Sequence, residues 1–127
     1  METLFRLHAK RWRDGTTGDF EGDRGRLHRE FAALALERGW LRLWFAEVEG
    51  EPAAAWYGWR FAGSDWHFQA GRDPRFDRLS VGAVLFAHTI REACGDGMDS
   101  YRFLAGTEDY KLHYADGDLG TETLMVG

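Results

Sequence analysis

The sequence contains few of the residues that mark disulfide-linked, metal-binding or membrane proteins. Its 127 residues include one cysteine, Cys94, and two prolines. A single cysteine excludes an internal disulfide and a cysteine-rich zinc site, and it suits a reducing compartment, where we expect Cys94 to be a buried thiol. No apolar run approaches the ~20 residues of a membrane span, and the N-terminus lacks the apolar core of a signal peptide. The sequence therefore predicts a cytoplasmic protein.

Positive charge is scarce as well, since 16 Lys and Arg stand against 21 Asp and Glu, a formal net charge of -5. Nucleic-acid binding needs clustered basic residues, so this balance argues against a broad nucleic-acid surface. The one local basic patch, at residues 6–13, is better explained as the solvated face of a helix. What the chain does have is apolar bulk, with 44% hydrophobic residues and six Trp. This composition and length predict a single compact domain over residues 1–127.

Hydrophobic periodicity predicts two helices in the first third of the chain. The first spans residues 2–13 and stops at the breaker in residues 14–18. The second spans residues 24–38, with Gly39 as its C-terminal cap. Its expected buried face consists of Leu27, Phe31, Leu34 and Ala35.

The period then changes to two, which predicts an antiparallel meander. Strands are expected from residue 41 to a turn at 49–51, then over 53–61 and 66–71. After an irregular connection, Ser80 caps a helix to about residue 93. A strand over 101–104, a short helix over 108–114 and a final strand over 121–126 complete the predicted order.

The start of the third long helix, Ser80-Val81-Gly82-Ala83, is the strongest candidate binding site. The first backbone N–H groups of a helix have no intrahelical acceptor and lie at the positive end of its dipole, so they can hold a phosphate. Gly82 allows close approach of the backbone. The alternative is that Ser80 merely caps a core helix, because caps are far more frequent than phosphate sites.

The element order, together with Ser80, Gly82, Gly106, Tyr110 and Lys111, resembles the GNAT acyltransferase superfamily. The resemblance is greatest to the acetyltransferase-like domain of bacterial proteins associated with cellulose biosynthesis and to FemAB-type proteins. It implies an α+β fold of three layers, in which helices flank a mixed, mostly antiparallel sheet. The superfamily's first strand has no counterpart here. The chain therefore resembles the C-terminal half of a larger architecture, and we expect a homodimer or a second GNAT-like half as partner.

The resemblance also implies the activity: direct transfer of an acetyl group from acetyl coenzyme A to an amine of a small molecule or peptide, without a metal. Ser80, Val81, Gly82 and Ala83 would bind the carrier. Tyr110 or Tyr114 would protonate the leaving thiolate, and Glu108 would act as base. Lys111 would face the substrate or the transition-state charge. Two alternatives stay open, namely FemAB-type aminoacyl transfer and a non-catalytic partner subunit.

Other chemically capable residues are better explained by structure. His67 and His88 are expected to be structural histidines, and neither has partners at metal-ligand spacing. Four tryptophans lie in the predicted strands: Trp44, Trp56, Trp59 and Trp66. They could line an acceptor pocket or an interface, although most of them should be core.

Overall fold

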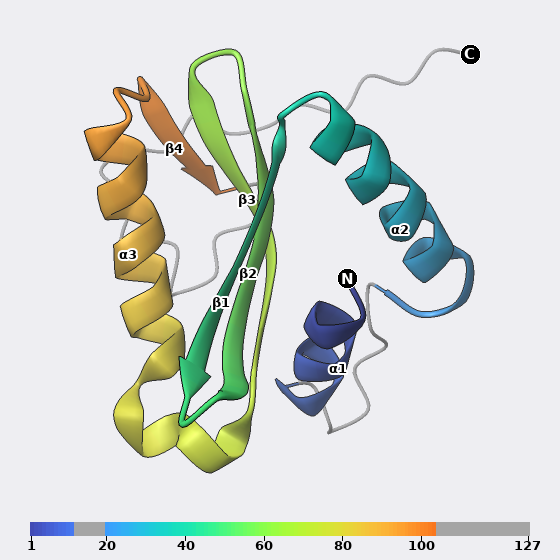
Figure 1. Ribbon diagram of the computed structural model, residues 1–127, viewed down its shortest axis with the longest axis vertical. Coiled ribbons are helices and arrows are strands. Elements are labelled where there is room, and N and C mark those ends of the chain that lie inside the picture. Colours follow the sequence, from blue (N-terminus) through green and yellow to red (C-terminus); the bar gives the residue numbers. More distant parts are fainter. Residues whose placement is uncertain (12–19, 104–127) are drawn as a thin grey trace, which may run out of the picture.

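The computed structural model describes residues 1–11 and 20–103, and the predicted short helix at 108–114 and strand at 121–126 lie outside these ranges. Every element predicted within the described ranges is present (Figure 1). In chain order, they are α1 (Glu2–Arg11), α2 (Gly22–Glu37), β1 (Leu41–Val48), β2 (Glu51–Phe61), β3 (Ser64–Arg72), the 3-10 helix η1 (Pro74–Leu79), α3 (Val81–Gly95) and β4 (Ser100–Phe103).

The four strands form one mixed sheet in the order β1-β2-β3-β4. The first three strands are antiparallel neighbours, as the meander predicts, and β4 lies parallel to β3. Helix α3 covers one face of the sheet, and α1 and α2 lie on the other (Figure 1). The expected three-layer α+β architecture is therefore confirmed.

Both hairpins close through two-residue turns with positive φ. The turn between β1 and β2 consists of Glu49 and Gly50 (φ 50° and 82°), and the turn between β2 and β3 consists of Ala62 and Gly63 (φ 53° and 78°). Two consecutive positive φ values match the right-handed twist of the flanking strands. These turns fix the register of the meander.

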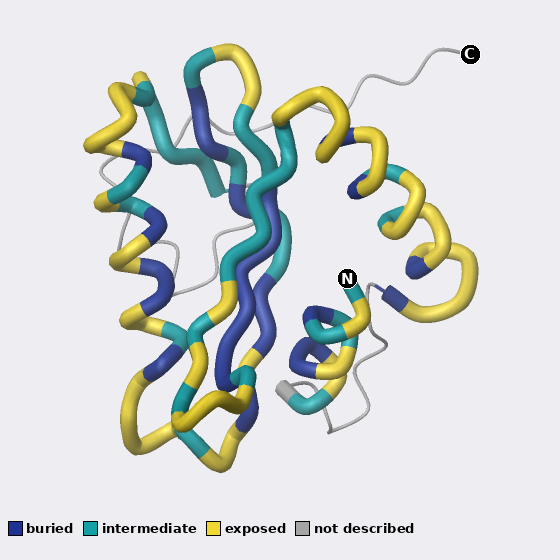
Figure 2. Tube along the Cα trace, in the orientation of Figure 1, coloured by how far each residue is buried: buried dark blue, intermediate teal, exposed yellow. Residues whose placement is uncertain are grey.

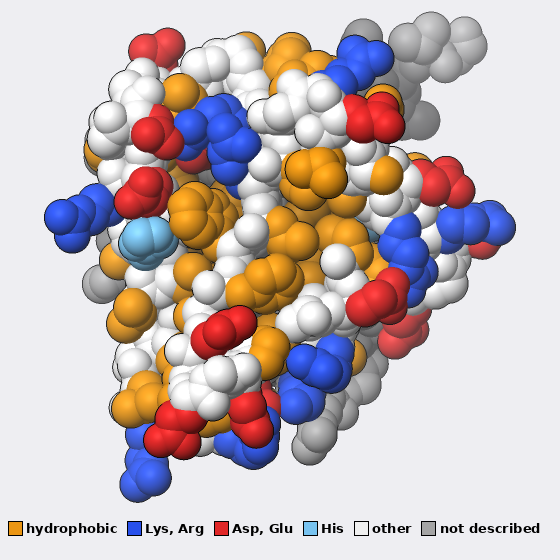
Figure 3. Space-filling model, in the orientation of Figure 1, with side chains coloured by type: hydrophobic (Ala, Val, Ile, Leu, Met, Phe, Trp, Pro, Cys, Tyr) orange, Lys and Arg blue, Asp and Glu red, His pale blue; other side chains and the backbone are white. Residues whose placement is uncertain are grey.

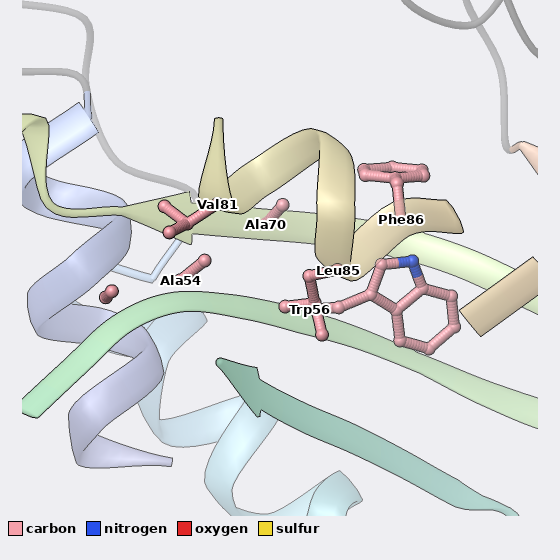
Figure 4. Packing of buried hydrophobic residues seen from close by; sticks show 7 residues of the cluster. Ala54, Trp56, Ala70, Val81, Leu85 and Phe86 are labelled. Atoms are coloured by element: carbon pink, nitrogen blue, oxygen red, sulfur yellow. The ribbon is translucent and has the colours of Figure 1, made fainter. Parts of the chain in front are cut away.

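The core lies on both faces of the central strand β2, whose residues 53–58 are all buried (Figure 2). On one face the Trp56 indole packs beneath α3 beside Leu85 and Phe86 (Figure 4). On the other, Tyr57 packs with Leu4 and Leu7 of α1. Because successive side chains of β2 point to opposite faces of the sheet, this one strand packs against both helical layers.

Two sequence predictions are wrong in detail. In α2, Leu27 and Leu34 are 61% and 45% exposed. Ala35 is buried as predicted, but the other buried residues of the helix are Gly25 and Ala32 rather than the leucines. A Cβ atom at Gly25 would clash with the Phe20 carbonyl oxygen, so this turn lies too close to its neighbour for a larger residue. Gly39 does follow the helix end with φ +72°, as predicted.

Cys94 is exposed rather than buried, because the last turn of α3 turns Ala93 toward the core and its neighbour toward solvent. None of the helices in the described ranges is long and apolar enough to cross a membrane.

Candidate active site

Within the described residues, Ser64 to His67 of β3 pair with Ser100 to Phe103 of β4. On its other side, β3 pairs Gln69 with Tyr57 but His67 with Gly58, so Phe68 is the extra residue of a β-bulge. A bulge bends its strand and increases the local twist. The sheet is thus irregular at Phe68, next to the described pairing of His67 with Phe103.

Gly58 is required opposite this bulge. A Cβ atom at this position would clash with the Trp66 carbonyl oxygen and lie 2.7 Å from the Trp56 ring. The lack of a side chain lets the two strands stay close while the register shifts.

The start of α3 has the properties expected of an anion site. Ser80 adopts the left-handed conformation (φ 51°, ψ 41°), and its side chain forms no cap hydrogen bond. Its carbonyl oxygen accepts from the Val84 N–H at 3.0 Å. The first turn carries no acidic side chain, and a Cβ at Gly82 would meet nothing within 4 Å. The prediction that Ser80 caps the helix is therefore wrong for its side chain.

A buried carboxylate fixes the segment that leads into α3. Asp73 accepts from the Arg75 backbone N–H at 3.1 Å, from Arg75 Nε and Nη2 at 3.0 and 2.9 Å, and from Lys10 Nζ at 2.9 Å. The hydrogen bonds from Arg75 and then from Lys10 hold the pKa of Asp73 well below its ordinary value. The Asp73 N–H also donates to the Ala53 carbonyl at 2.8 Å. One side chain thus connects η1 to α1, and its backbone connects η1 to β2.

Sequence reasoning missed this role of Asp73 and described residues 72–79 only as an irregular connection. The pattern was readable, because an Asp that precedes Pro74 at the first position of a helix is a favoured N-cap.

The four residues predicted to bind the carrier lie together at the start of α3. Val81 is buried in the core, Gly82 is half-buried, and Ser80 and Ala83 are exposed. The predicted catalytic residues lie outside the described ranges: Glu108, Tyr110, Lys111 and Tyr114.

The histidines of interest have structural surroundings. His67 is buried, with its ring centroid 4.7 Å from that of Phe86 and 5.3 Å from that of Trp56. His88 is half exposed, with Nε2 3.9 Å from the Glu92 carboxylate and its ring against Trp44. Both observations agree with the structural interpretation of these residues.

A further pair lies on the opposite face of the sheet. The Tyr57 hydroxyl is 3.1 Å from His28 Nδ1, and burial raises the pKa of Tyr57 to about 12. The phenol therefore stays protonated at neutral pH.

The tryptophans divide between core and cavity. Trp56 is fully buried, and its Nε1–H donates to the Tyr101 hydroxyl at 2.8 Å. Trp59 and Trp66, in contrast, border a hollow of about 340 Å³ on the α2 side of the sheet. The lining residues of this aromatic cavity are Phe31, Trp40, Trp59, Phe61 and Trp66. The expectation that most of the strand tryptophans are core thus fails for these two.

Solved structures with the same fold are acetyltransferases. A possible acetyltransferase from Clostridium difficile 630 has a TM-score of 0.66 and 17% identity, over 96% of this chain and 87% of that one. An aminoglycoside acetyltransferase from an uncultured soil metagenomic sample, in complex with sisomicin, has a TM-score of 0.65 and 14% identity, over 99% and 88%. AAC(6')-Iy, in complex with the bisubstrate analogue CoA-S-monomethyl-acetylneamine, has a TM-score of 0.59 and 17% identity, over 99% and 88%. At these identities the likeness shows the fold alone.

The sequence itself identifies the family. No curated protein matches the chain at a significant level. Residues 1–112, however, match the family model described as acetyltransferase (GNAT) domain. The narrower resemblance to cellulose-associated and FemAB-type proteins stays a prediction. Because the match covers most of its length, the chain belongs to the GNAT acetyltransferase family.

Proposed function

We propose that the protein is an N-acetyltransferase that moves an acetyl group from acetyl coenzyme A directly to an amine. Membership of the acetyltransferase family supports the reaction type. The observation that carries the proposal is the start of α3, where an open glycine, a Ser80 side chain that does not cap and the absence of acidic residues in the first turn occur together. The backbone N–H groups of Val81, Gly82 and Ala83 would hold the pyrophosphate of the carrier.

Acetyl coenzyme A supplies an activated thioester when bound. In the transfer, the amine nitrogen forms a bond to the acetyl carbon, the carbon–sulfur bond breaks, and the thiolate takes a proton. Glu108 would accept the proton from the amine, and Tyr110 or Tyr114 would protonate the thiolate. Lys111 would offset the negative charge of the transition state.

The acceptor does not follow from the fold, since one fold serves many substrates. Two of the similar structures contain aminoglycoside-type ligands, but their low identity leaves the acceptor of this chain open. Aminoacyl transfer from tRNA is the less favoured alternative, because a net charge of -5 opposes RNA binding.

Calorimetric titration with acetyl coenzyme A tests the carrier site. We expect saturable binding by the wild type and at least a tenfold loss in Gly82→Trp, whose ring would cover the amides. A folded wild-type chain that binds no acetyl coenzyme A would contradict the proposal and favour a non-catalytic partner subunit.

The acid is identified by comparing two matched variants. The two variants are Tyr110→Phe and Tyr114→Phe. The one that removes the catalytic acid should lower kcat by roughly 10²-fold or more, whereas the kcat of the other should stay near that of the wild type. Acetyl coenzyme A binding should be unchanged in both. Full activity in both single variants and in the double variant would eliminate the phenol mechanism.

A further inference from the structure

The aromatic cavity is a hollow to which the acetyl transfer proposed above assigns no role. Its volume of about 340 Å³ lies within the range of small-molecule sites. Its lining residues come from α2, from Trp40 just after α2, and from the ends of β2 and β3. Phe61 at its rim is 51% exposed, so the cavity opens to solvent.

The walls of the cavity are held by contacts among the rings themselves. Trp59 packs edge-on against Phe31, with centroids 5.5 Å apart, and stacks on Phe68 at 5.9 Å. Trp40 meets Phe61 edge-on at 5.2 Å. The Trp66 Nε1–H donates to the Phe61 carbonyl at 3.3 Å. Such walls are ordered before a ligand arrives, which lowers the entropic cost of binding a flat ring.

Two guanidinium groups lie against rings of this lining. The Arg38 guanidinium is 5.3 Å from the centroid of Trp40, and that of Arg102 is 5.1 Å from the centroid of Trp66. Arg102 Nε donates to the Ser100 hydroxyl at 3.1 Å, which fixes its direction. Neither guanidinium joins an ion pair with a carboxylate in the part of the chain that the structure describes, in contrast to Arg60 with Asp65 and Asp96.

This arrangement distinguishes between ligand charges. Aromatic cages often bind cations through the ring faces. Here Arg38 and Arg102 already occupy ring faces and would repel a second cation. An anionic group would instead gain charge-assisted hydrogen bonds from the two guanidinium groups.

We propose that the aromatic cavity binds a planar aromatic ring that carries a carboxylate. The ring lies among Trp40, Trp59 and Trp66, and the carboxylate is held by Arg38 or Arg102. This binding goes beyond acetyl transfer and does not depend on acetyl coenzyme A.

Three matched indoles test the proposal by calorimetry in the absence of acetyl coenzyme A. Indole-3-acetate has the ring and the carboxylate, indole-3-acetamide is its neutral analogue, and tryptamine carries a positive charge. We expect saturable binding of indole-3-acetate, binding of the amide weaker by about tenfold, and tryptamine weakest. Equal affinities, tightest binding of tryptamine, or no binding of indole-3-acetate would each overturn the proposal.

Variants on the full chain assign the binding to this cavity. Arg38→Gln and Arg102→Gln should together remove the preference for the acetate over the amide, and Phe61→Ala should weaken both ligands. Arg91→Gln, at an exposed residue outside the lining, is the control and should change neither. A preference for the acetate that survives in the Arg38→Gln, Arg102→Gln variant would also overturn the assignment. If indole-3-acetate does not bind and Phe61→Ala dissociates a dimer, the cavity is an interface between copies and the proposal fails.

Discussion

Asp73 holds three segments of the chain through one residue: α1 through Lys10, η1 through Arg75 and β2 through its backbone. Its side chain is 3% exposed. Removing the charge of a buried, multiply bonded carboxylate costs about 1–3 kcal/mol. We expect Asp73→Asn to lower the free energy of unfolding at pH 7 by this amount, as measured in urea. Asp23→Asn, at a carboxylate 93% exposed, is the control and should be nearly neutral.

The lowered pKa of Asp73 predicts the direction in which the free energy of unfolding changes with pH. The folded-state pKa of Asp73 is lowered from an ordinary value of about 4, so its stabilisation is fully present above that pH and is lost as the pH falls below it. The difference in stability between the wild type and Asp73→Asn should therefore shrink between pH 6 and pH 3. A difference that stays constant over this range would show that Asp73 acts through packing rather than charge.

Substitutions at Gly82 distinguish a structural role of the start of α3 from a role in binding. Gly82→Glu adds a negative charge to a helix start that has none, which should stabilise the folded chain by about 0.3–1 kcal/mol. The same charge should weaken acetyl coenzyme A binding at least tenfold, because it would face the phosphates of a carrier bound as proposed. The neutral isostere Gly82→Gln should bind more tightly than Gly82→Glu. Equal carrier affinity in the two variants would mean that the phosphates lie elsewhere.

At the scale of elements, α1 and β3 pack backbone against backbone. A Cβ at Gly71 would clash with the His8 amide and lie 2.6 Å from the Leu7 carbonyl carbon. Gly71→Ala must displace α1, and overpacking of this kind costs about 1–3 kcal/mol. Gly95→Ala, within α3 and with nothing within 4 Å, should instead stabilise by about 0.5–1 kcal/mol. Thermal unfolding of the two variants should give shifts of opposite sign, and a neutral Gly71→Ala would disprove the tight contact.

The elements were predictable from the sequence wherever local pattern decides structure. The alternation from Leu41 to Phe45 and the breaker after Ala93 located β1 and α3 within a few residues. The buried face of α2 was predicted only at Ala35, because Gly25 and Ala32 have too little apolar side chain to mark a buried face in the sequence. The bulge at Phe68 depends on pairing across strands, which no single-strand pattern contains.

The candidate sites divide in the same way. The start of α3 is contiguous in sequence, and so Ser80 to Ala83 could be recognised from local pattern. The aromatic cavity joins Phe31 to Trp66 through three elements, and only the folded chain brings them together. The left-handed Ser80 was missed because serine gives no preference for positive φ.

At the scale of the whole molecule, several large apolar side chains of the sheet and of α2 are exposed to solvent. Among the described strands, β1 is at an edge of the sheet, and Phe45 within it is 37% exposed. Leu27, Leu34 and Leu36 of α2 are 45–67% exposed. Figure 3 shows hydrophobic side chains gathered over the β1 edge and between the sheet and α2. Open strand edges are pairing surfaces that proteins normally cover or blunt.

Part of this edge is already protected, which locates where a partner would bind. Arg42 Nη1 donates to the Leu41 carbonyl at 2.9 Å, and the register of β1 shifts between Ala46 and Glu47. Both features interrupt pairing at the ends of the strand. The middle of β1, around Phe45, is left as the available segment.

We therefore predict that the protein forms a homodimer through the middle of β1. Light scattering should show a dimer at micromolar concentration, and Phe45→Lys should convert it to a monomer, because a charge at the centre of an edge strand opposes pairing. The variant should remain folded, as checked by circular dichroism, because Phe45 is 37% exposed and lies outside the buried core. Arg91→Lys, an exposed change on α3, should leave the dimer intact. A wild-type chain that stays monomeric at high concentration would exclude the dimer. A dimer that survives Phe45→Lys would place the contact elsewhere.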